Sequence, residues 1–567
     1  MILAPAETIA AYRAGRGWGS ETVYDVFRAN VARYPGDEAV VDPPNRAEFT
    51  DGEPQRLNWS ALAEKVDRLA AVLTEAGVGR DDFVCIQLPT THEILVAYMA
   101  VLRVGAIATP VAMQYRAHEL TYILRHCRAC AFVTCARIGR WPHAEMALAL
   151  REAVPSLRHV LAFGAAVPPG AIALDAALAS PKDTAVAEPA AVTADDIAIL
   201  LWTSGSEAEP KPVPRSHNNI LANRAMMSEA ADLGHDSRIL APRLMNTTGG
   251  ITGAMLPWLD RGATLVLHQP FRLDVFLAQI RDEAIDFTSC PPGVLHDLLG
   301  RDDLRREIDF PRLRYISSGS AALAESVLRG FADRFGVEVM NFYGSSEGAS
   351  LAAIAKDIPD PAKRARFFPR YGDRRFTWHA TPARHMETKL VDPASGERIE
   401  TPGVVGEICF RGPNVFPGYF EAPELTARAV DAEGFYHSGD LFEIAGKDGE
   451  YYRFVGRAKD IIVRGGMNIS AEELDTLLGD HPGIREVAVV GYPDDKLGEK
   501  VCAAVVPKDG REVTLVEIAA FLRNEKQVAV FKLPQRIVTV EALPRTASGK
   551  IARARLRALV GTLPESA

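Results

Sequence analysis

A strand-to-loop segment, Ile197 to Lys211 (IAILLWTSGSEAEPK), carries the first residues whose types and spacing indicate chemistry. An apolar run leads into a Thr, Ser and Gly loop, and a lysine follows. Backbone N–H groups and hydroxyls of such a loop can donate to phosphate oxygens, and the ammonium adds positive charge. The segment lacks the GxxxxGK[ST] spacing of the Walker loop, so it indicates a phosphate site of another kind.

A second segment, Asn341 to Gly348 (NFYGSSEG), contains Gly344, Ser346 and Gly348 in the GxSxG spacing of a hydrolase nucleophile elbow. An elbow also requires an Asp and a His in triad roles, and no downstream setting singles such residues out. A hydrolase that cleaves esters or thioesters without ATP therefore stays open as an alternative.

Three more motifs follow, and they decide the interpretation. They are FYHSGDL (435–441), VGRAKDIIVRGGMNIS (455–470) and PRTASGKIARARLR (544–557). In order and separation, the five motifs resemble the adenylate-forming superfamily of acyl-CoA and aryl-CoA synthetases, non-ribosomal adenylation domains and luciferases. The resemblance covers essentially the whole chain. The segments YRAGRGW (12–18), PRSHNN (214–219) and VFKLPQRI (530–537) are most similar to 2,3-dihydroxybenzoate adenylating enzymes and to benzoate or cyclohexanecarboxylate CoA ligases.

Members of that superfamily make an acyl-AMP from a carboxylic acid and ATP, release pyrophosphate, and pass the acyl group to a thiol. A carboxylate is already a nucleophile, so no general base is needed. Coulomb repulsion opposes its approach to the triphosphate. Catalysis should therefore depend on positioning and on positive charge at the α-phosphate and the leaving pyrophosphate.

The resemblance implies a nucleotide site assembled from several motifs. The β- and γ-phosphates would be held by Thr203, Ser204, Gly205 and Lys211. The adenine would be contacted by Tyr343, Gly344, Gly319, Ser320 and Ala321. Asp440 would accept the ribose hydroxyls, and Arg457 would lie near ribose or phosphate.

The same resemblance implies three catalytic roles. Ser346 would bond the α-phosphate, and Glu347 would hold Mg²⁺ as a hard oxygen ligand. Lys550, on a small C-terminal lobe, would bridge the substrate carboxylate and the α-phosphate. Taken singly, Asp440 fits an Asx turn, Glu347 a surface carboxylate and Lys550 a loop cap.

A pivot of the small lobe is implied at Lys459. The pivot would move Lys550 out of the site and bring in the segment that contains Gly465 and Gly466. A glycine has no Cβ, so this segment would leave room for the pantetheine arm of coenzyme A. The expected cofactors are ATP, Mg²⁺ and coenzyme A.

The sequence departs from the superfamily pattern at two places. In the phosphate loop, Glu207, Ala208 and Pro212 replace the usual Thr, Gly and Gly, and Glu209 adds a second carboxylate. Carboxylates beside a triphosphate are unfavourable, so a non-catalytic relative that binds nucleotide or acyl ligand stays open. In the acyl pocket, Met245 replaces a histidine or aromatic residue. The adjacent Asn246 matches an asparagine of aryl-acid relatives and favours a cyclic acid.

Length, charge and composition limit the other possibilities. The chain has 567 residues, too many for one small binding module, and a formal net charge of -9, which disfavours a nucleic-acid binder. The N-terminus does not have the pattern of a secretory signal, and the apolar segment Ile94 to Tyr115 contains Arg103 and two glycines, so we expect a buried helix and turn rather than a membrane span. Seven cysteines, an odd number, suit a cytoplasmic protein with buried thiols.

Alternating apolar runs and amphipathic stretches predict an α/β fold of stacked βαβ sheets. We expect an N-terminal ATP- and acid-binding domain over 1–456, with a β-rich subdomain over about 386–456. Residues 457–460 would form the hinge, and 461–567 a mobile α+β lobe. The basic stretch Lys363 to Arg375 is predicted to be a solvated loop.

These observations predict an ATP-dependent acid:CoA ligase that acts through an acyl-adenylate on an aromatic or alicyclic acid. The alternative within the class loads the acyl group onto the phosphopantetheine of a carrier protein. Expected partners are the small-molecule acid, ATP and CoA, with an acyl carrier protein as a further option. No nucleic acid or stable membrane insertion is expected, and the protein should be a monomer or homodimer.

Overall fold

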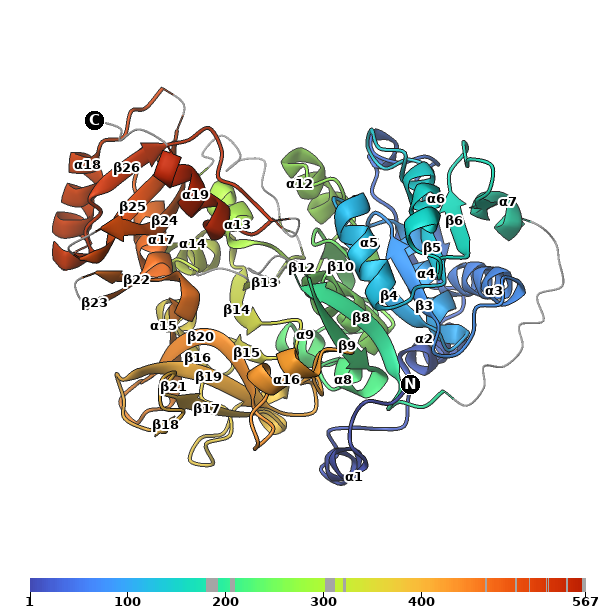
Figure 1. Cartoon of the computed structure of the whole chain (residues 1–567), viewed down its shortest axis with the longest axis horizontal. Helices are drawn as coiled ribbons and strands as arrows, with labels where there is room; N and C mark the ends of the chain where they lie inside the picture. The colour runs from blue at the N-terminus through green and yellow to red at the C-terminus, as the bar shows by residue number, and fades with distance from the viewer. Residues whose placement is uncertain are drawn as a thin grey trace.

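The described strands are arranged in four sheets, which Figure 1 shows coloured by residue number. The computed structural model describes residues 1–179, 192–203, 210–300, 310, 312–319, 323–464, 467–494, 497–508, 510–526, 528, 530–546 and 549–562, and of Lys459, Met467 and Asn468 the backbone only. Two sheets form the body at the right and centre of Figure 1, a third lies at the lower left, and the C-terminal sheet lies above the third.

The first sheet has seven strands in the order β7-β6-β5-β3-β4-β8-β9. Their bounds are β3 (Phe83–Gln87), β4 (Ile107–Pro110), β5 (Ala131–Cys135), β6 (His159–Phe163), β7 (Ile172–Ala173), β8 (Ile197–Thr203) and β9 (Lys211–Ser216). The strands are parallel except at β9, which pairs antiparallel with β8. The predicted phosphate loop therefore leaves β8 and the chain returns along β9.

The second sheet has eight strands in the order β15-β14-β13-β12-β10-β11-β1-β2. Their bounds are β1 (Glu38–Val41), β2 (Arg56–Asn58), β10 (Arg238–Ala241), β11 (Thr264–Leu267), β12 (Phe287–Ser289), β13 (Tyr315–Gly319), β14 (Glu338–Gly344) and β15 (Ser350–Ala353). The middle of this sheet is parallel and both edge pairs are antiparallel. The carboxyl ends of β10, β12, β13 and β14 thus lie along one edge.

Helices cover both faces of each parallel sheet, as alternation along the strands requires. Cys85 and Phe132 pack with α5 (Ala117–His126) and α6 (His143–Ala153), whereas Val84 and Val133 face α3 (Trp59–Glu75) and α4 (His92–Arg103). The second sheet shares α3 and α4 in the same core. Its other face is covered by α12 (Leu273–Asp282), α13 (Pro292–Gly300) and α14 (Glu325–Phe335). The predicted α/β class with stacked βαβ layers is confirmed.

Aromatic stacking helps to lock this shared core. Trp59 of α3 and Trp258 of α11 (Leu256–Arg261) stack with ring centroids 4.8 Å apart and planes 10° apart. Both side chains are fully buried, and Trp258 Nε1 donates to the Ala39 carbonyl in β1 at 3.0 Å. Further helices of this domain are α1 (Ala6–Ala14), α2 (Val23–Arg33), α7 (Leu174–Ala179), α8 (His217–Leu221), α9 (Met226–Ala230) and α10 (Thr248–Gly250).

The third sheet is antiparallel and has six strands in the order β16-β21-β20-β19-β17-β18. Their bounds are β16 (Phe367–Pro369), β17 (Glu387–Val391), β18 (Arg398–Ile399), β19 (Val405–Arg411), β20 (Tyr436–Ala445) and β21 (Tyr451–Arg457), and α16 (Pro423–Ala429) lies between β19 and β20 in the chain. The sheet corresponds to the predicted β-rich unit, but β16 begins it before residue 386.

The C-terminal sheet has the order β23-β22-β25-β24, with β26 beside β25. Its strands are β22 (Ile461–Arg464), β23 (Met467–Ser470), β24 (Ile484–Asp494), β25 (Gly498–Pro507) and β26 (Arg536–Thr539). The helices α17 (Ala471–Gly479), α18 (Leu515–Ala520) and α19 (Arg553–Thr562) complete the lobe. Its two apolar clusters lie on opposite faces of the β24–β25 pair, so the lobe has its own core.

Two sequence expectations need correction. The segment Ile94 to Tyr115 contains the predicted buried helix, α4, but the chain then forms strand β4 rather than only a turn. The basic stretch Lys363 to Arg375 is not a solvated loop, because it contains α15 (Pro361–Arg366) and β16. Arg364 within it is fully buried and donates from Nε to the Val339 carbonyl at 3.0 Å.

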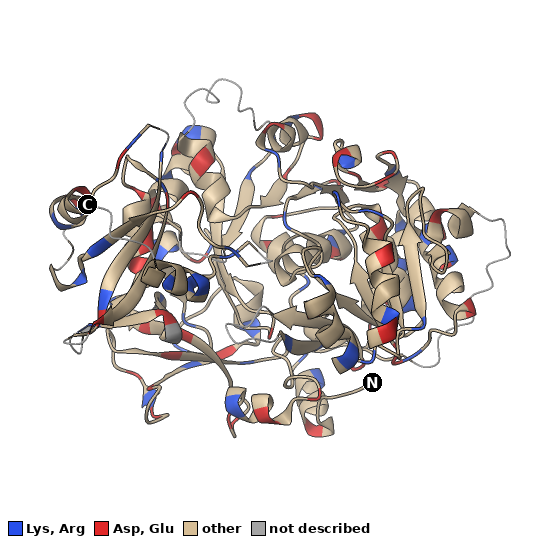
Figure 2. Ribbon diagram, turned by 45° about the horizontal axis from the view of Figure 1, so that its top comes forward, with Lys and Arg blue, Asp and Glu red and all other residues tan. Residues whose placement is uncertain are grey.

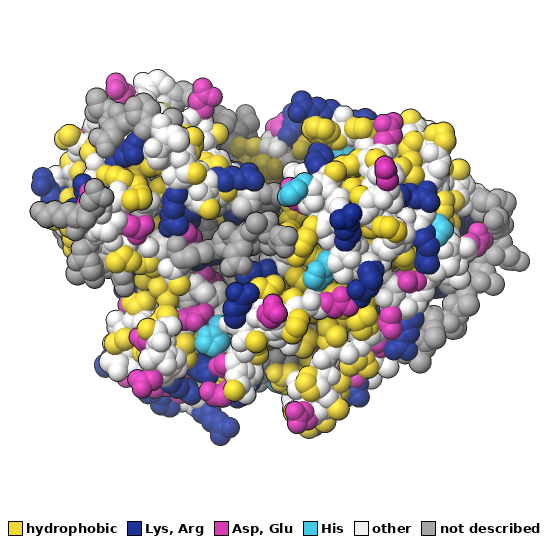
Figure 3. All heavy atoms as spheres, in the orientation of Figure 1, with side chains coloured by type: hydrophobic (Ala, Val, Ile, Leu, Met, Phe, Trp, Pro, Cys, Tyr) yellow, Lys and Arg dark blue, Asp and Glu magenta, His cyan; other side chains and the backbone are white. Residues whose placement is uncertain are grey.

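Charge is spread over the surface rather than gathered on one face. Figure 2 shows Lys and Arg interspersed with Asp and Glu along the ribbon, and Figure 3 shows both signs mixed over one face. All seven cysteines are buried and free of disulfides. None of the described helices has both the length and the hydropathy that a bilayer crossing requires.

A buried ion cluster lies at the N-terminus of α4. Arg46 NH1 donates to Asp42 Oδ2 at 2.9 Å, and its NH2 pairs with Glu93. His92 Nδ1 lies 2.8 Å from the same Asp42 oxygen, and all four residues are buried. Ion pairs with His92 and Arg46 hold the pKa of Asp42 below its ordinary value despite burial, which alone would raise it.

We predict that Arg46→Met lowers the free energy of unfolding by about 3–5 kcal/mol, because two buried carboxylates lose the guanidinium that pairs with both. The matched control is Arg56→Met, whose exposed guanidinium pairs with Glu38 and Glu283 and should cost less than about 1 kcal/mol. Urea unfolding followed by tryptophan fluorescence measures both. Equal losses in the two variants would contradict the assignment.

Candidate active site

The motif residues gather where parallel strands of the large domain end, the usual ligand edge of an α/β sheet. Thr203 ends β8, Gly319 ends β13 and Gly344 ends β14. At Gly319 a Cβ would lie 2.1 Å from the Phe342 carbonyl oxygen, so only glycine allows β13 and β14 this approach. Ser204, Gly205, Ser320 and Ala321 lie outside the described residues, as do Glu207, Ala208 and Glu209.

Tyr343 and Asp440, predicted to contact adenine and ribose, are in direct contact. The Tyr343 hydroxyl donates to Asp440 Oδ2 at 2.5 Å, and the ring stacks on Phe410 with centroids 5.8 Å apart. Burial and the adjacent Asp440 carboxylate raise the pKa of Tyr343 well above its ordinary value. Tyr343 therefore stays a neutral donor to the carboxylate.

Arg457 faces Asp440 from the neighbouring strand. The two residues pair across β20 and β21, and Arg457 Nε lies 3.3 Å from Asp440 Oδ1. Burial acts to lower the pKa of Arg457, but Asp440 and Glu472 outweigh it and the pKa is raised. Asp440 is buried, so the guanidinium compensates a charge that water reaches poorly.

The turn before Asp440 is held by residues that the sequence analysis did not select. Glu407 Oε1 accepts the Gly439 N–H at 2.7 Å, and Ser438 Oγ accepts the Asp440 N–H at 3.1 Å. His437 Nδ1 lies 3.0 Å from Glu407 Oε2, and this hydrogen bond raises the pKa of His437. In the sequence, the signal for these supporting residues was the histidine of the FYHSGDL motif.

Beside the same turn lie three side chains of types that can bind metal ions. Glu407, Cys409 and His437 have ligand atoms within 4.8 Å of one another. Ion pairs already engage the imidazole, because its Nε2 also lies 3.4 Å from Asp431 Oδ2. This cluster therefore supports the Asp440 turn as it stands.

The GSSEG turn connects β14 to β15 and places Ser346 between the two parallel sheets. Ser346 Oγ lies 2.8 Å from Thr248 Oγ1, and the Ser346 carbonyl accepts from Arg215 NH1 of β9 at 2.7 Å. At Gly348, φ is 105° and a Cβ would lie 1.8 Å from the Asn414 carbonyl oxygen, so glycine is required there. A strand, not a helix, follows the turn, so it does not form the strand–turn–helix of a hydrolase elbow.

Arg215 is a positioning residue that the sequence analysis noted only as part of PRSHNN. Besides Ser346, it donates from NH2 to the Asn414 carbonyl at 2.7 Å and to the Asn219 carbonyl at 3.1 Å. Burial lowers its pKa to about 10, although Glu347 acts against this. Arg215 thus braces the turn that carries both Ser346 and Glu347.

Glu347 and Lys211 meet at the ring of Tyr419. Glu347 is buried, which excludes the surface alternative, and its Oε1 accepts the Tyr419 hydroxyl at 3.0 Å. Lys211 Nζ lies 5.7 Å from the centroid of the Tyr419 ring. A single carboxylate beside a phosphate site fits Mg²⁺, which takes one or two carboxylates together with substrate phosphates.

Lys550 reaches the same site from the C-terminal lobe. Gly549 has φ of 83°, and a turn is closed by the Thr546 N–H bonding the Lys550 carbonyl at 2.7 Å. The charges of Arg457, Asp440, Arg243 and Glu472 act on the Lys550 ammonium. Lys550 is exposed to solvent, but nearby protein atoms partly desolvate its ammonium. This desolvation and the charge of Arg457 lower the pKa of Lys550, although Asp440 opposes the shift.

The predicted hinge and acyl-pocket residues are placed as follows. Lys459 lies in a short 3₁₀ turn, Ala458–Asp460, between β21 and β22, and Gly465 and Gly466 lie outside the described residues.

Met245 and Asn246 are buried after β10. Tyr98 Oη donates to the Met245 carbonyl at 3.0 Å, and Asn246 Nδ2 donates to the Val111 carbonyl at 2.8 Å.

Comparison with known proteins identifies the family. A model described as AMP-binding enzyme matches residues 27–420, and one described as AMP-binding enzyme C-terminal domain matches residues 473–550. The chain belongs to the AMP-binding enzyme family. It is an adenylate-forming enzyme whose relatives include AMP-forming acid:CoA ligases.

Two such relatives extend over nearly the whole chain. The enzyme is 34% identical over 551 residues to the medium-chain fatty-acid–CoA ligase of Escherichia coli (strain K12), which covers 97% of this chain and 92% of the relative. It is 31% identical over 578 residues to the 2-hydroxy-7-methoxy-5-methyl-1-naphthoate–CoA ligase of Streptomyces carzinostaticus, covering 99% and 97%. Among solved structures, ATP-bound MatB from Rhodopseudomonas palustris is 25% identical with a TM-score of 0.79, covering 96% of this chain and 99% of that one.

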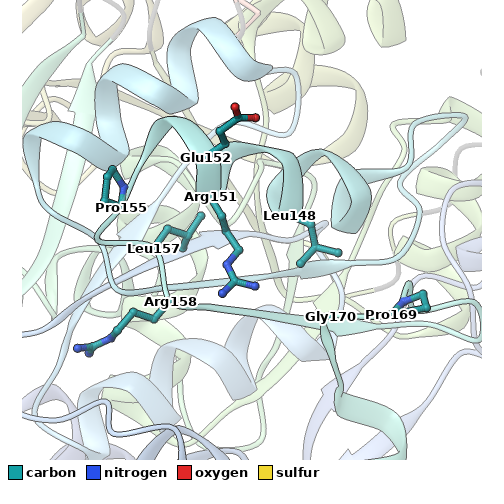
Figure 4. A pocket seen from close by; sticks show the side chains of 8 residues that line it. All are labelled: Leu148, Arg151, Glu152, Pro155, Leu157, Arg158, Pro169 and Gly170. Atoms are coloured by element: carbon teal, nitrogen blue, oxygen red, sulfur yellow. The ribbon is translucent and has the colours of Figure 1, made fainter.

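A broad surface hollow lies elsewhere, between α6 and the loop before β7. It has a volume of about 580 Å³, and Figure 4 shows its lining: Leu148, Arg151, Glu152, Pro155, Leu157, Arg158, Pro169 and Gly170. None of the motif residues lines it. The candidate active site is therefore the strand-end cluster and not this hollow.

We predict that the rate of adenylation falls at alkaline pH because Lys550 loses its proton. We expect the protonated form of Lys550 to supply charge to this step. Its lowered pKa means that the proton leaves below the ordinary value of 10.5, so kcat/KM should fall as pH rises. Arginine stays charged over this range, so Lys550→Arg should shift the alkaline limb upward. Pyrophosphate release measured between pH 7 and 10.5 tests this. If kcat/KM falls at the same alkaline pH in both proteins, the titrating group is not Lys550.

Proposed function

We propose that this enzyme converts an aromatic or alicyclic carboxylic acid to its CoA thioester through an acyl-adenylate, using ATP and Mg²⁺. The proposal rests on the ion pair of Asp440 and Arg457, with Nε and Oδ1 3.3 Å apart, and on Lys550 of the C-terminal lobe, whose pKa both residues influence. A cation brought from a separate lobe to the nucleotide site suits a reaction limited by charge repulsion.

In the first step, the acid's carboxylate oxygen attacks the α-phosphorus and pyrophosphate leaves. Lys550 would neutralise charge between the carboxylate and the α-phosphate, and Ser346 would hold an α-phosphate oxygen. Lys211, with Thr203, Ser204 and Gly205, would hold the β- and γ-phosphates. Glu347 would hold Mg²⁺, which supplies positive charge to the phosphate oxygens when bound. The residues position and neutralise, and no protein base is required.

The nucleoside would be fixed at the other end of the cluster. Asp440 would accept the ribose hydroxyls, and Tyr343 and Gly344 with Gly319, Ser320 and Ala321 would contact the adenine. Tyr343 now donates to one oxygen of Asp440, so ribose binding would share or replace that hydrogen bond. Arg457 would keep the Asp440 carboxylate ionised and oriented throughout.

In the second step, the small lobe, residues 461–567, would pivot at Lys459 within the hinge 457–460. The pivot would withdraw Lys550 from the domain of residues 1–456 and present Gly465 and Gly466. The thiol sulfur of coenzyme A would attack the acyl carbonyl, lose its proton to solvent, and release AMP. Two orientations of one lobe would thus serve two incompatible half-reactions.

The acyl pocket supports a cyclic acid that carries a hydrogen-bond donor. Asn246 Oδ1 is buried and has no hydrogen-bond partner among the described residues, so a hydroxyl or similar donor on the acid would satisfy it. Met245 supplies an apolar wall in the same segment. The naphthoate ligase among the relatives agrees in substrate class.

A carrier-protein phosphopantetheine is the second candidate acceptor, because the same thiol chemistry serves both. We further propose a cytoplasmic protein, in keeping with seven free buried cysteines, that is a monomer or homodimer and does not bind nucleic acid.

We predict that Lys550→Ala lowers acid-dependent pyrophosphate release by at least about 100-fold, because a preorganised charge at the transition state is removed. Thioester formation from supplied acyl-adenylate should be retained, since Lys550 acts only in the first step. The matched control is Lys532→Ala, whose ammonium pairs with Glu473 on the same lobe and should leave both steps unchanged. Full pyrophosphate release by Lys550→Ala would refute the role.

We predict that CoA, added to the enzyme with benzoate, cyclohexanecarboxylate, salicylate or hexanoate, is consumed in proportion to pyrophosphate. Coupled pyrophosphate and free-thiol assays measure the ratio for each acid. Adenylate formation without thiol loss would favour a carrier protein instead. ATP-independent thioester cleavage that is lost in Ser346→Ala but kept in Lys550→Ala would restore the hydrolase alternative.

A further inference from the structure

The pairing of β19 with β20 is irregular at the place where β20 carries Asp440. The register shifts there, so that residues 438–440 of β20 lie opposite the single residue Ile408 of β19. A bulge of this kind interrupts the hydrogen-bond ladder and re-aims the side chains that it carries. The direction of the Asp440 carboxylate therefore depends on the groups that hold the bulge.

The backbone of the bulge is held by three hydrogen bonds. Ser438 Oγ donates to the Ile408 carbonyl at 2.7 Å and accepts the Asp440 N–H at 3.1 Å. Gly439 has φ of 71°, a conformation that a Cβ would disfavour, and its N–H donates to Glu407 Oε1 at 2.7 Å. Glu407 thus holds the bulge through the residue next to Asp440.

Glu407 is held in turn by His437, which lies at the other end of the bulge. Its second oxygen, Oε2, lies 3.0 Å from His437 Nδ1, and His437 Nε2 lies 3.4 Å from Asp431 Oδ2. Lys389 Nζ lies 2.8 Å from that Asp431 oxygen. The hydrogen bond with Glu407 and the charges of both carboxylates raise the pKa of His437, although burial opposes this. The imidazole is therefore fixed at both nitrogens.

The ion pair of His437 and Glu407 contributes little to folding, because the two side chains are 27% and 16% exposed. Its geometric effect is larger, since Glu407 contacts the backbone one position before Asp440. Ribose binding would share or replace the hydrogen bond that Tyr343 donates to Asp440. The bulge must then keep the carboxylate aimed, and a carboxylate that is already aimed loses less freedom on binding.

We propose that Glu407 and His437 are positioning residues for the nucleotide, which hold the bulge that aims Asp440 and so set how strongly affinity depends on the ribose hydroxyls. The inference rests on the proposed function, which places those hydroxyls on Asp440. Glu407 acts on Asp440 through the Gly439 N–H, and His437 acts through Glu407. Their substitution should therefore weaken only nucleotides that carry the hydroxyls.

The test compares the binding of AMP and 2′,3′-dideoxy-AMP by isothermal titration calorimetry. Wild-type enzyme should bind AMP tighter by about tenfold or more, because hydroxyls donate to a carboxylate. Glu407→Ala should weaken AMP by about 5- to 30-fold and the dideoxy analogue by less than about twofold. His437→Ala should weaken AMP alone, and the double variant should match Glu407→Ala, because His437 acts through Glu407.

Milder variants keep the test decisive if Glu407→Ala folds poorly. Glu407→Gln keeps an acceptor for the Gly439 N–H but loses the ion pair, so it should weaken AMP by about threefold and spare the dideoxy analogue. In pyrophosphate release, both Glu407 variants should raise KM for ATP and change kcat by less than about threefold. Thermal melting verifies the fold of each variant.

Two matched controls test pairs of the same kind elsewhere. Glu387→Ala removes a carboxylate of the same sheet that pairs with Arg411 at 2.7 Å. His379→Ala removes an exposed imidazole that lies 2.9 Å from Asp357. Both should leave the affinities for AMP and its dideoxy analogue unchanged.

The possible failures are distinguishable. Equal weakening of AMP and the dideoxy analogue in the Glu407 variants, or no weakening of either, would overturn the inference. Additive losses in the double variant would overturn the role of His437. Wild-type enzyme that binds both nucleotides equally would overturn the ribose role of Asp440 together with the inference.

Failure of the proposed function has a different signature. The wild type would then distinguish the two nucleotides and the variants would lose this distinction, but benzoate, cyclohexanecarboxylate, salicylate and hexanoate would all give no pyrophosphate release. That result would overturn the proposed ligase activity and support the inference.

Discussion

The buried carboxylate of Asp440 is the constraint on which the site depends. Its charge must be compensated where water is scarce, and Arg457 and the Tyr343 hydroxyl do this from a neighbouring strand and from the large parallel sheet. The Asp440 carboxylate also acts on the pKa of Lys550, which belongs to the C-terminal lobe. One anion thus interacts with groups of the eight-stranded sheet, the antiparallel sheet and the small lobe, and we propose that the lobes meet there for chemistry.

The scaffold makes this convergence possible by stacking two parallel sheets around shared helices. The strand ends form one edge, and the GSSEG turn lies against it. Only glycine fits at position 348, because any Cβ there would clash with the Asn414 carbonyl. Arg215 ties that turn to β9 of the other sheet. Arg215 and Arg457 thus place positive charge at the site even though the enzyme has a net charge of -9.

Much of the fold could be predicted because apolar runs and their spacing report strands and helices directly. The motif spacing also selected Tyr343 and Asp440, which are in direct contact, and Ser346 and Glu347, which share the GSSEG turn. The buried Arg364 could not be predicted, since a basic run has no signal for a side chain that folds back onto backbone carbonyls. The placement of Arg243 could not be predicted for a related reason, because its acceptors at positions 289, 290 and 319 are brought together only by the sheet.

The most direct test of the central claim is a crystal structure with a non-hydrolysable acyl-sulfamoyl adenosine, which mimics the adenylate and should bind tightly. We expect ribose hydroxyls on the Asp440 carboxylate, Arg457 still beside it, and Lys550 within hydrogen-bond distance of the sulfamate or acyl oxygen. An adenylate bound at this edge with Asp440 held only by Tyr343 and Arg457, and touching no ribose hydroxyl, would contradict it.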